Sequence, residues 1–124
     1  VSRDFSRSFA VQRKIEVMKE EANPDVLITH DTGCVTTLDQ SQFAAKAHNR
    51  NVGLPVMSDS QLAALAMGAH PYKVLQLHWH STSSKPFLEK LGIDHEKAWA
   101  EFEEAAERIK SGQQQYLTWE DCDV

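Results

Sequence analysis

Residues 23–34 read NPDVLITHDTGC, and the architecture of the chain follows from this segment. Asn23-Pro24 is expected to stop a preceding helix, because proline disfavours the helical conformation of the residue before it. The apolar run Val26-Leu27-Ile28-Thr29 predicts a short buried strand, since consecutive apolar residues are typical of a parallel sheet that helices cover on both faces. Gly33 interrupts the pattern, and a helix is expected to begin around Val35 to Thr37. The segment therefore predicts a strand, a tight turn and a helix.

Helical patterns lie on both sides of this unit. The helix predicted over residues 6–22 repeats its apolar side chains at intervals of four, three and four: Val11, Ile15, Met18 and Ala22. An extended segment is predicted over 54–57, and further helices are predicted after a Ser58-to-Gln61 capping box, from Pro86 to Leu91 and after a cap at Asp94. Alternating strands and helices imply an α/β fold with a small parallel sheet flanked by helices and a helical C-terminal extension. Only two strands are clear, so a partner or an upstream segment is expected to complete the sheet.

Length and composition limit the classes of function that this chain can have. The chain has 124 residues, 41% of them hydrophobic, with 13 basic and 18 acidic residues and a net charge of −5. We expect one α/β domain over residues 1–112 and a polar tail over 113–124. The sequence lacks a basic stretch interleaved with aromatic residues, which is the pattern typical of nucleic-acid binding. No apolar run approaches the ~20 residues of a membrane span. Without a signal-peptide pattern, the expected compartment is the cytoplasm.

Cys34 is the sharpest candidate for chemistry, because it lies where a strand's carboxyl end meets a helix's amino end. Ligands bind at that place in open α/β sheets, and the unpaired N–H groups and helix dipole there favour a thiolate. The alternative is a buried cysteine that packs as a small hydrophobic residue. Cys122 is flanked by Asp121 and Asp123, whose carboxylates oppose a thiolate. We therefore expect Cys34 to be the more reactive thiol and Cys122 to be incidental.

Histidines supply the other candidates. His78 and His80, with His70 nearby, form a His-x-His pattern that on an extended segment points both imidazoles to one side and suits zinc or another transition metal. A structural or solvent-facing role is the alternative for this pair. His30, four residues before Cys34, is a candidate partner for a thiolate, or else a loop histidine bonded to the backbone.

Several motifs follow one another in a defined order: DTGC at 31–34, LDQSQ at 38–42 and PVMSDSQLAALAMG at 55–68. In this order they resemble the second half of a CCG domain of the heterodisulfide reductase B family, over about residues 11–91. In that family a Cys-x-x-Cys at a strand end precedes a Leu-Asp-x-x-Gln helix, a Pro-Val segment and a Gln-Leu-x-x-Leu-Ala-x-Gly helix.

This resemblance implies an iron–sulfur subunit of an oxidoreductase that acts on disulfides or sulfur compounds, assembled with other iron–sulfur and flavin subunits. In the family, paired cysteines hold a four-iron cluster of non-cubane type, or zinc in degenerate copies. Cys34 and Asp31 occupy the two positions of the Cys-x-x-Cys motif, so Asp31 replaces its first cysteine, and these residues contain no upstream CCG motif. Because such clusters need several thiolates, we expect no complete four-iron cluster on this chain alone.

Three hypotheses follow. The first is a subunit of a heterodisulfide-reductase-like complex that works in electron transfer or disulfide redox chemistry. The second is a non-catalytic assembly module of such a complex with a degenerate metal site. The third is a separate thiol enzyme that uses Cys34 with His30.

Overall fold

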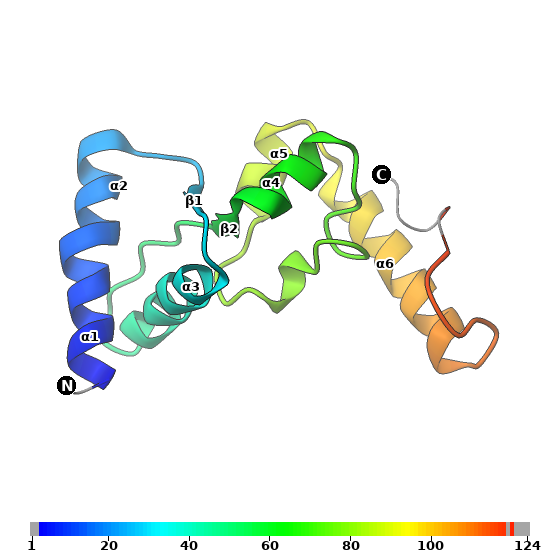
Figure 1. Ribbon diagram of the computed structural model, residues 1–124, viewed down its shortest axis with the longest axis horizontal. Helices are drawn as coiled ribbons and strands as arrows, with labels where there is room; N and C mark the ends of the chain where they lie inside the picture. Colours follow the sequence, from blue (N-terminus) through cyan, green and yellow to red (C-terminus); the bar gives the residue numbers. More distant parts are fainter. Residues whose placement is uncertain (1–2, 119, 121–124) are drawn as a thin grey trace.

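A two-stranded parallel sheet lies between helical ends, with α1 and α2 at one end of the molecule and α6 at the other (Figure 1). The computed structural model describes residues 3–118 and 120. The elements are α1 (Arg3–Ala10), a π-helical segment (Val11–Ile15), α2 (Glu16–Ala22), β1 (Leu27–Thr29), α3 (Thr32–Lys46), β2 (Val56–Ser58), α4 (Asp59–Ala66), a 3₁₀ turn (Leu77–Trp79), α5 (Lys85–Lys90) and α6 (His95–Lys110). The predicted α/β fold with a helical C-terminal extension is confirmed. Within the described ranges, no helix is long and apolar enough to cross a membrane.

The sheet is one β-α-β unit, in which α3 connects β1 to the parallel strand β2. Parallel strands need such a crossover, because the chain must return to the starting edge of the sheet. The register pairs Leu27 with Val56, Ile28 with Met57 and Thr29 with Ser58. The two strands therefore end side by side, and the residues that follow them share one edge of the sheet.

Each face of the sheet packs against its own hydrophobic cluster, because successive strand side chains point to opposite faces. Leu27 packs against a cluster with the buried residues Val11, Ile15, Ala45 and Leu54. Ile28 packs against a larger cluster that includes Met57, Leu65, Leu77 and Leu88. The expectation that helices cover both faces is thus confirmed.

β1 is half-buried along its whole length, whereas the sequence predicts a buried strand. In the described residues the sheet has two strands, so the outer edge of β1 has no neighbouring strand to cover it. β2 is fully buried. The apolar run identifies the strand correctly, but the burial of the strand depends on what covers its outer edge, which the run does not specify.

α3 begins at Thr32, earlier than predicted, because Asp31 caps it. The Asp31 carboxylate accepts a hydrogen bond from the Cys34 backbone N–H at 3.2 Å. A Cβ on Gly33 would lie 2.8 Å from Asp31 Oδ2, so glycine leaves the room that this cap requires. Gly33 therefore lies inside the first helical turn and does not interrupt the helix, which corrects the sequence prediction.

The first helical region runs without a break from α1 to α2 and contains a π-helical segment in the middle. Val11 and Ile15 are buried as predicted, but Ala22 is exposed. The wider π turn shifts the positions after Ile15 around the axis, so the predicted apolar stripe does not continue to the helix end. Asn23 stops the helix in a left-handed conformation, with φ 44°.

Two polar side chains of α3 fasten it to the rest of the chain. The Gln42 amide nitrogen donates to the Leu54 carbonyl at 2.7 Å, and its oxygen accepts from the Leu54 N–H at 2.9 Å. The buried Asp39 carboxylate accepts hydrogen bonds from the backbone N–H groups of Ser81 and Thr82, at 2.6 and 2.9 Å. Both side chains form hydrogen bonds with backbone groups that lie outside helices and strands and so have no partner in regular secondary structure.

The predicted caps of the later helices are confirmed. The Ser58 hydroxyl accepts from the Gln61 N–H while the Gln61 side chain accepts from the Ser58 N–H, which completes the capping box of α4. Asp94 accepts from the Lys97 N–H at the start of α6.

We expect Gln42→Ala to lower the free energy of unfolding by about 2 kcal/mol or more, because it leaves a buried N–H and a buried carbonyl of Leu54 unpaired. Urea denaturation measures this loss. Gln40→Ala is the matched control, since Gln40 is exposed on the same helix. Equal effects of the two substitutions would contradict a structural role for the Gln42 amide.

Candidate functional site

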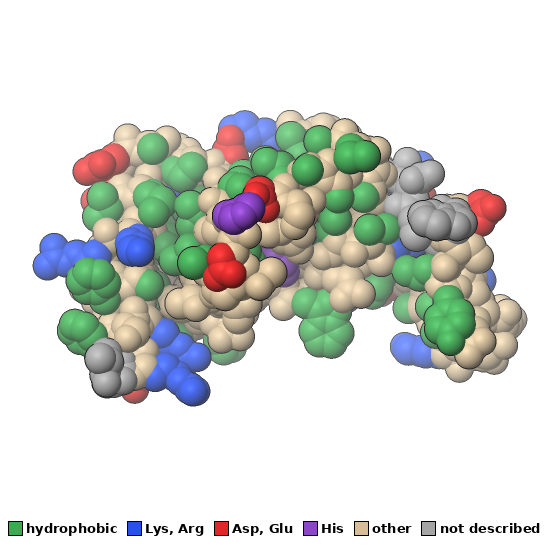
Figure 2. All heavy atoms as spheres, in the orientation of Figure 1, with side chains coloured by type: hydrophobic (Ala, Val, Ile, Leu, Met, Phe, Trp, Pro, Cys, Tyr) green, Lys and Arg blue, Asp and Glu red, His purple; other side chains and the backbone are tan. Residues whose placement is uncertain are grey.

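Polar side chains gather where the two parallel strands end. His30 follows β1, Asp59 follows β2, and Cys34 lies in the first turn of α3. The His30 Nδ1 and the Asp59 Oδ2 are 2.5 Å apart and tie the two strand ends together. Figure 2 shows histidine and acidic side chains next to one another on this face, over the region where β1 leads into α3. In open α/β sheets this edge is where ligands bind.

The His30–Asp59 pair is solvent-exposed, and each partner stabilises the charged form of the other. The hydrogen bond to Asp59, followed by its negative charge, raises the pKa of His30, and the nearby Asp31 adds a smaller effect. The hydrogen bond from His30 lowers the pKa of Asp59. His30 therefore binds a side chain across the sheet, whereas the sequence leaves open a thiolate partner or a backbone contact.

Cys34 is exposed and has a free thiol. It is the third residue of α3, at the carboxyl end of β1, as the sequence predicts. Asp31 is exposed beside it, and its carboxylate is engaged by the Cys34 N–H. Asp31 thus acts as a helix cap at the position where the resemblance to the family implies a cysteine. Cys122 lies outside the described residues, so the order of reactivity of the two thiols stays a prediction.

Asp59 is the site residue that sequence reasoning missed. A usable signal was present, because the capping box from Ser58 to Gln61 makes Asp59 the first residue of the helix after β2. The carboxyl ends of adjacent parallel strands meet at one edge, so Asp59 had to lie near the residue that follows β1.

His80 is held by β2 and α4. Its Nδ1 lies 2.8 Å from the Val56 carbonyl, which can only accept, so Nδ1 carries the proton and donates. The Nε2 lone pair then faces the Gln61 amide nitrogen at 3.4 Å. His80 therefore covers a carbonyl on the outer edge of β2.

His78 belongs to an aromatic cluster against α6. Its ring centroid lies 4.4 Å from that of Phe102 and about 6.2 Å from those of Tyr72 and Trp99. The His78 Nδ1 is buried and has no hydrogen-bond partner among the residues that the structure describes. Burial lowers the pKa of His78, so the neutral ring is favoured.

The structure does not bring the four candidate residues into one group. His78 contacts α6 and His80 contacts β2, while Cys34 and Asp31 lie at the start of α3. Among residues 3–118 and 120, no three His, Cys, Asp or Glu side chains lie close enough to hold a metal ion. Metal binding by His78 and His80 stays a prediction.

His70, which the sequence places near this pair, is fully buried and acts as a local anchor. Its Nδ1 accepts from the N–H groups of Tyr72 and Lys73, and its Nε2 lies 3.2 Å from a Glu101 carboxylate oxygen. Both acceptor contacts place the proton on Nε2, which donates to Glu101.

The fold and the site define an α/β protein whose candidate site is an exposed cysteine at the carboxyl end of a parallel strand pair. The chain is 36% identical over 75 residues to a heterodisulfide reductase B-like protein of Archaeoglobus profundus. The aligned part covers 59% of this chain and 25% of that relative, so the chain spans about a quarter of the relative's length. No family model and no solved structure matches the chain. The similarity supports the resemblance to the heterodisulfide reductase B family.

We expect NMR titration to show a His30 pKa above the ordinary imidazole value, and Asp59→Asn to return it toward that value. The pair stabilises the fold only where Asp59 is ionised and His30 is protonated. Its contribution is lost as pH rises through the raised His30 pKa and as pH falls through the lowered Asp59 pKa. Asp31→Asn is the control and should lower the His30 pKa by less, because Asp31 is the smaller contributor.

We expect His78→Phe to raise the free energy of unfolding by about 1 kcal/mol, because it removes a buried nitrogen without a partner. The gain should be larger at about pH 5 than at about pH 7.5. The fold disfavours protonation of His78, so the free energy of unfolding of the wild-type protein falls as pH falls, whereas that of the variant lacks this loss. His80→Phe is the comparison and should destabilise, because it uncovers the Val56 carbonyl. A loss of stability in His78→Phe at both pH values, measured by urea denaturation, would contradict this role.

Proposed function

We propose that the chain, through residues 1–112, is a module of a heterodisulfide-reductase-like oxidoreductase complex, active in electron transfer or in redox chemistry of disulfides or sulfur compounds. The observation that carries this proposal is the exposed Cys34 thiol in the first turn of α3, at the carboxyl end of β1. The ordered motifs that resemble a CCG domain surround this cysteine. The similarity to the Archaeoglobus profundus protein also supports the proposal.

The residues of this chain do not by themselves fit a four-iron cluster. Such clusters are held by several thiolates, and the two cysteines of the chain are Cys34 in the α/β domain and Cys122 in the tail. Asp31 already accepts the Cys34 N–H, so its carboxylate is engaged in the fold. A non-cubane cluster or a zinc ion would therefore need ligands from other parts of the assembly, with Cys34 contributing one thiolate.

Partners of this module would be the iron–sulfur and flavin subunits of such a complex. An exposed thiol on a sheet edge, with no neighbouring group of metal-binding side chains in the described residues, is suited to a site completed by another chain. The role of Cys34 in this proposal is to supply a ligand or a redox-active thiol at that contact.

A second candidate is a non-catalytic assembly module of the same kind of complex. The cap formed by Asp31 favours it, because the side chain at the first motif position stabilises the helix and adds negative charge next to Cys34. In this case the fold is kept for its surface, and Cys34 has no chemical role.

The two candidates differ in what Cys34→Ser does to the intact complex. The complex is purified anaerobically through a tag on this chain, and its iron, acid-labile sulfide and disulfide-reducing turnover are measured. We expect the substitution to lower iron and sulfide content and to reduce turnover at least about tenfold, because a serine hydroxyl is a far poorer ligand and nucleophile than a thiolate. Thr36→Ser, on an exposed position of the same helix, is the control and should change nothing.

Unchanged metal content and turnover in an intact Cys34→Ser complex would support the assembly module and reject a redox role. Absence of iron–sulfur or flavin subunits from the purified complex would reject both candidates. A stoichiometric four-iron cluster in the isolated chain would contradict the expectation that its ligands come from more than one chain.

A further inference from the structure

The polarity of α1 is opposite to that of an ordinary surface helix. Phe5 and Phe9 are 65% and 50% exposed, and their rings stack on each other with centroids 6.2 Å apart. The face of the same helical region that is turned toward α3 carries mainly polar side chains: Asp4, Arg7, Ser8 and Gln12, with the buried Val11 between them. A surface helix normally places its apolar stripe against its neighbour. Local departures of this kind are expected at functional sites, where another requirement outweighs packing.

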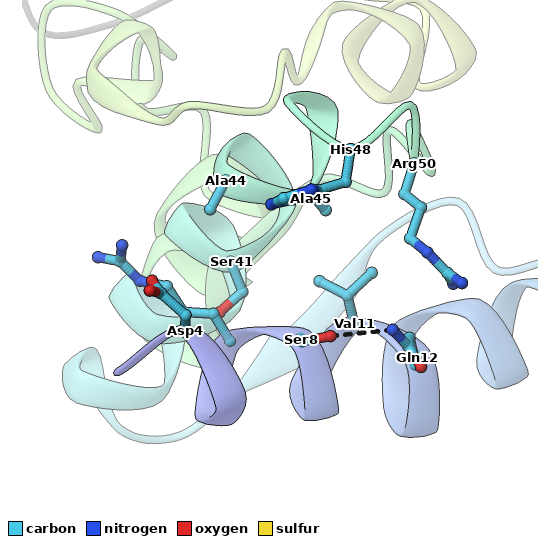
Figure 3. A pocket seen from close by; sticks show the side chains of 10 residues that line it. Asp4, Ser8, Val11, Gln12, Ser41, Ala44, Ala45, His48 and Arg50 are labelled. Carbon is cyan, nitrogen blue, oxygen red and sulfur yellow. Dashed lines mark hydrogen bonds between the residues drawn. The ribbon is translucent and has the colours of Figure 1, made fainter. Parts of the chain in front are cut away.

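A cavity of about 350 Å³ lies between this polar face and α3. Figure 3 shows Ser41, Ala44 and Ala45 of α3 opposite Ser8, Val11 and Gln12, with Asp4 and Arg50 toward the two ends. The small side chains of α3 leave space that larger apolar residues would fill.

The floor of the cavity is apolar, and its rim is charged. Val11 and Ala45 are buried, and the Ser41 hydroxyl is occupied by its bond to the Thr37 carbonyl at 2.5 Å. The rim is formed by Arg7, Arg50, His48 and Asp4. A ligand with an apolar body and a polar head would match this division.

The two arginines of the rim differ in how they are engaged. Arg50 is held in place by hydrogen bonds from its Nη1 to both carboxylate oxygens of Glu16, at 2.9 and 2.8 Å. Arg7 makes no hydrogen bond or ion pair with any residue in the described ranges. Guanidinium groups bind carboxylates and phosphates through paired N–H donors, so an unpaired one at a cavity rim is suited to an oxyanion.

We propose that this cavity binds a small organic oxyanion, with its carboxylate or phosphate group on Arg7 and its apolar part on Val11, Ala44 and Ala45. The cavity lies toward the carboxyl end of α3, whereas Cys34 lies at the amino end, and the first lining residue Ser41 is roughly 10 Å further along the helix. The binding site is therefore separate from the candidate redox site, and it does not depend on the proposed function.

The test uses phenyl phosphate, benzoate and phenol as probes and follows the methyl resonances of Val11, Ala44 and Ala45 by NMR titration of the full chain. We expect phenyl phosphate or benzoate to shift these resonances and phenol to bind at least about tenfold more weakly, because it lacks the charged group. The stronger of the two anions identifies the head group. No shift of these methyl groups with either anion, or equal binding of phenol, would overturn the proposal.

Two variants assign the charge that holds the anion. Arg7→Ala should lower the affinity for the anion at least about tenfold. Arg13 lies on the same helical region but outside the cavity, so Arg13→Ala should leave the affinity unchanged. Asp4→Asn removes the opposing carboxylate and should tighten binding, which keeps the test decisive if Arg7→Ala fails to fold. Equal weakening by the two arginine substitutions would show diffuse charge attraction, and no tightening in Asp4→Asn would show that the anion does not bind at this end of the cavity. Either result would overturn the proposal.

Discussion

The exchange of two buried hydrogen bonds between the Gln42 amide and the Leu54 backbone is the contact on which the rest of the sheet depends. It fastens α3 to the segment that leads directly into β2, and so sets where that strand begins. The register of β2 against β1 follows, with Leu27 opposite Val56. If α3 were displaced by one turn, a buried N–H and a buried carbonyl would be left unpaired. The free-energy cost of that exceeds what most single contacts contribute to stability.

Asp39 extends this control to the second half of the molecule. It lies three residues before Gln42, so both side chains project from nearly the same side of α3. Its carboxylate accepts the N–H groups of Ser81 and Thr82 in the loop before α5. The polar residues of the Leu-Asp-x-x-Gln motif therefore position two separate segments. In this structure that motif is architectural.

The residues at the strand ends carry charges of opposite sign close to one another. The helix amino terminus offers unpaired N–H groups, but here the Asp31 carboxylate accepts the hydrogen bond of the Cys34 N–H and so places a negative charge at the first turn of α3. On the other side, the Asp59 carboxylate keeps His30 in its protonated form more readily than an isolated imidazole. The result is a solvent-exposed group of alternating charges beside one exposed thiol.

Local features of this protein can be predicted from its sequence: the stop at Asn23, the Ser58 capping box, the Asp94 cap and a strand and helix around Cys34, because each depends on residues within a few positions of one another. Even there, the predicted start of α3 is too late, since the side chain of Asp31 is not recognised as its cap. The pairing of His30 with Asp59, 29 residues apart, and of His80 with Val56, 24 residues apart, arises only when the chain folds. So does the half-burial of β1. These features depend on which segments the crossover brings together. The order of apolar and polar residues along the chain does not specify the distances in space between side chains of such segments.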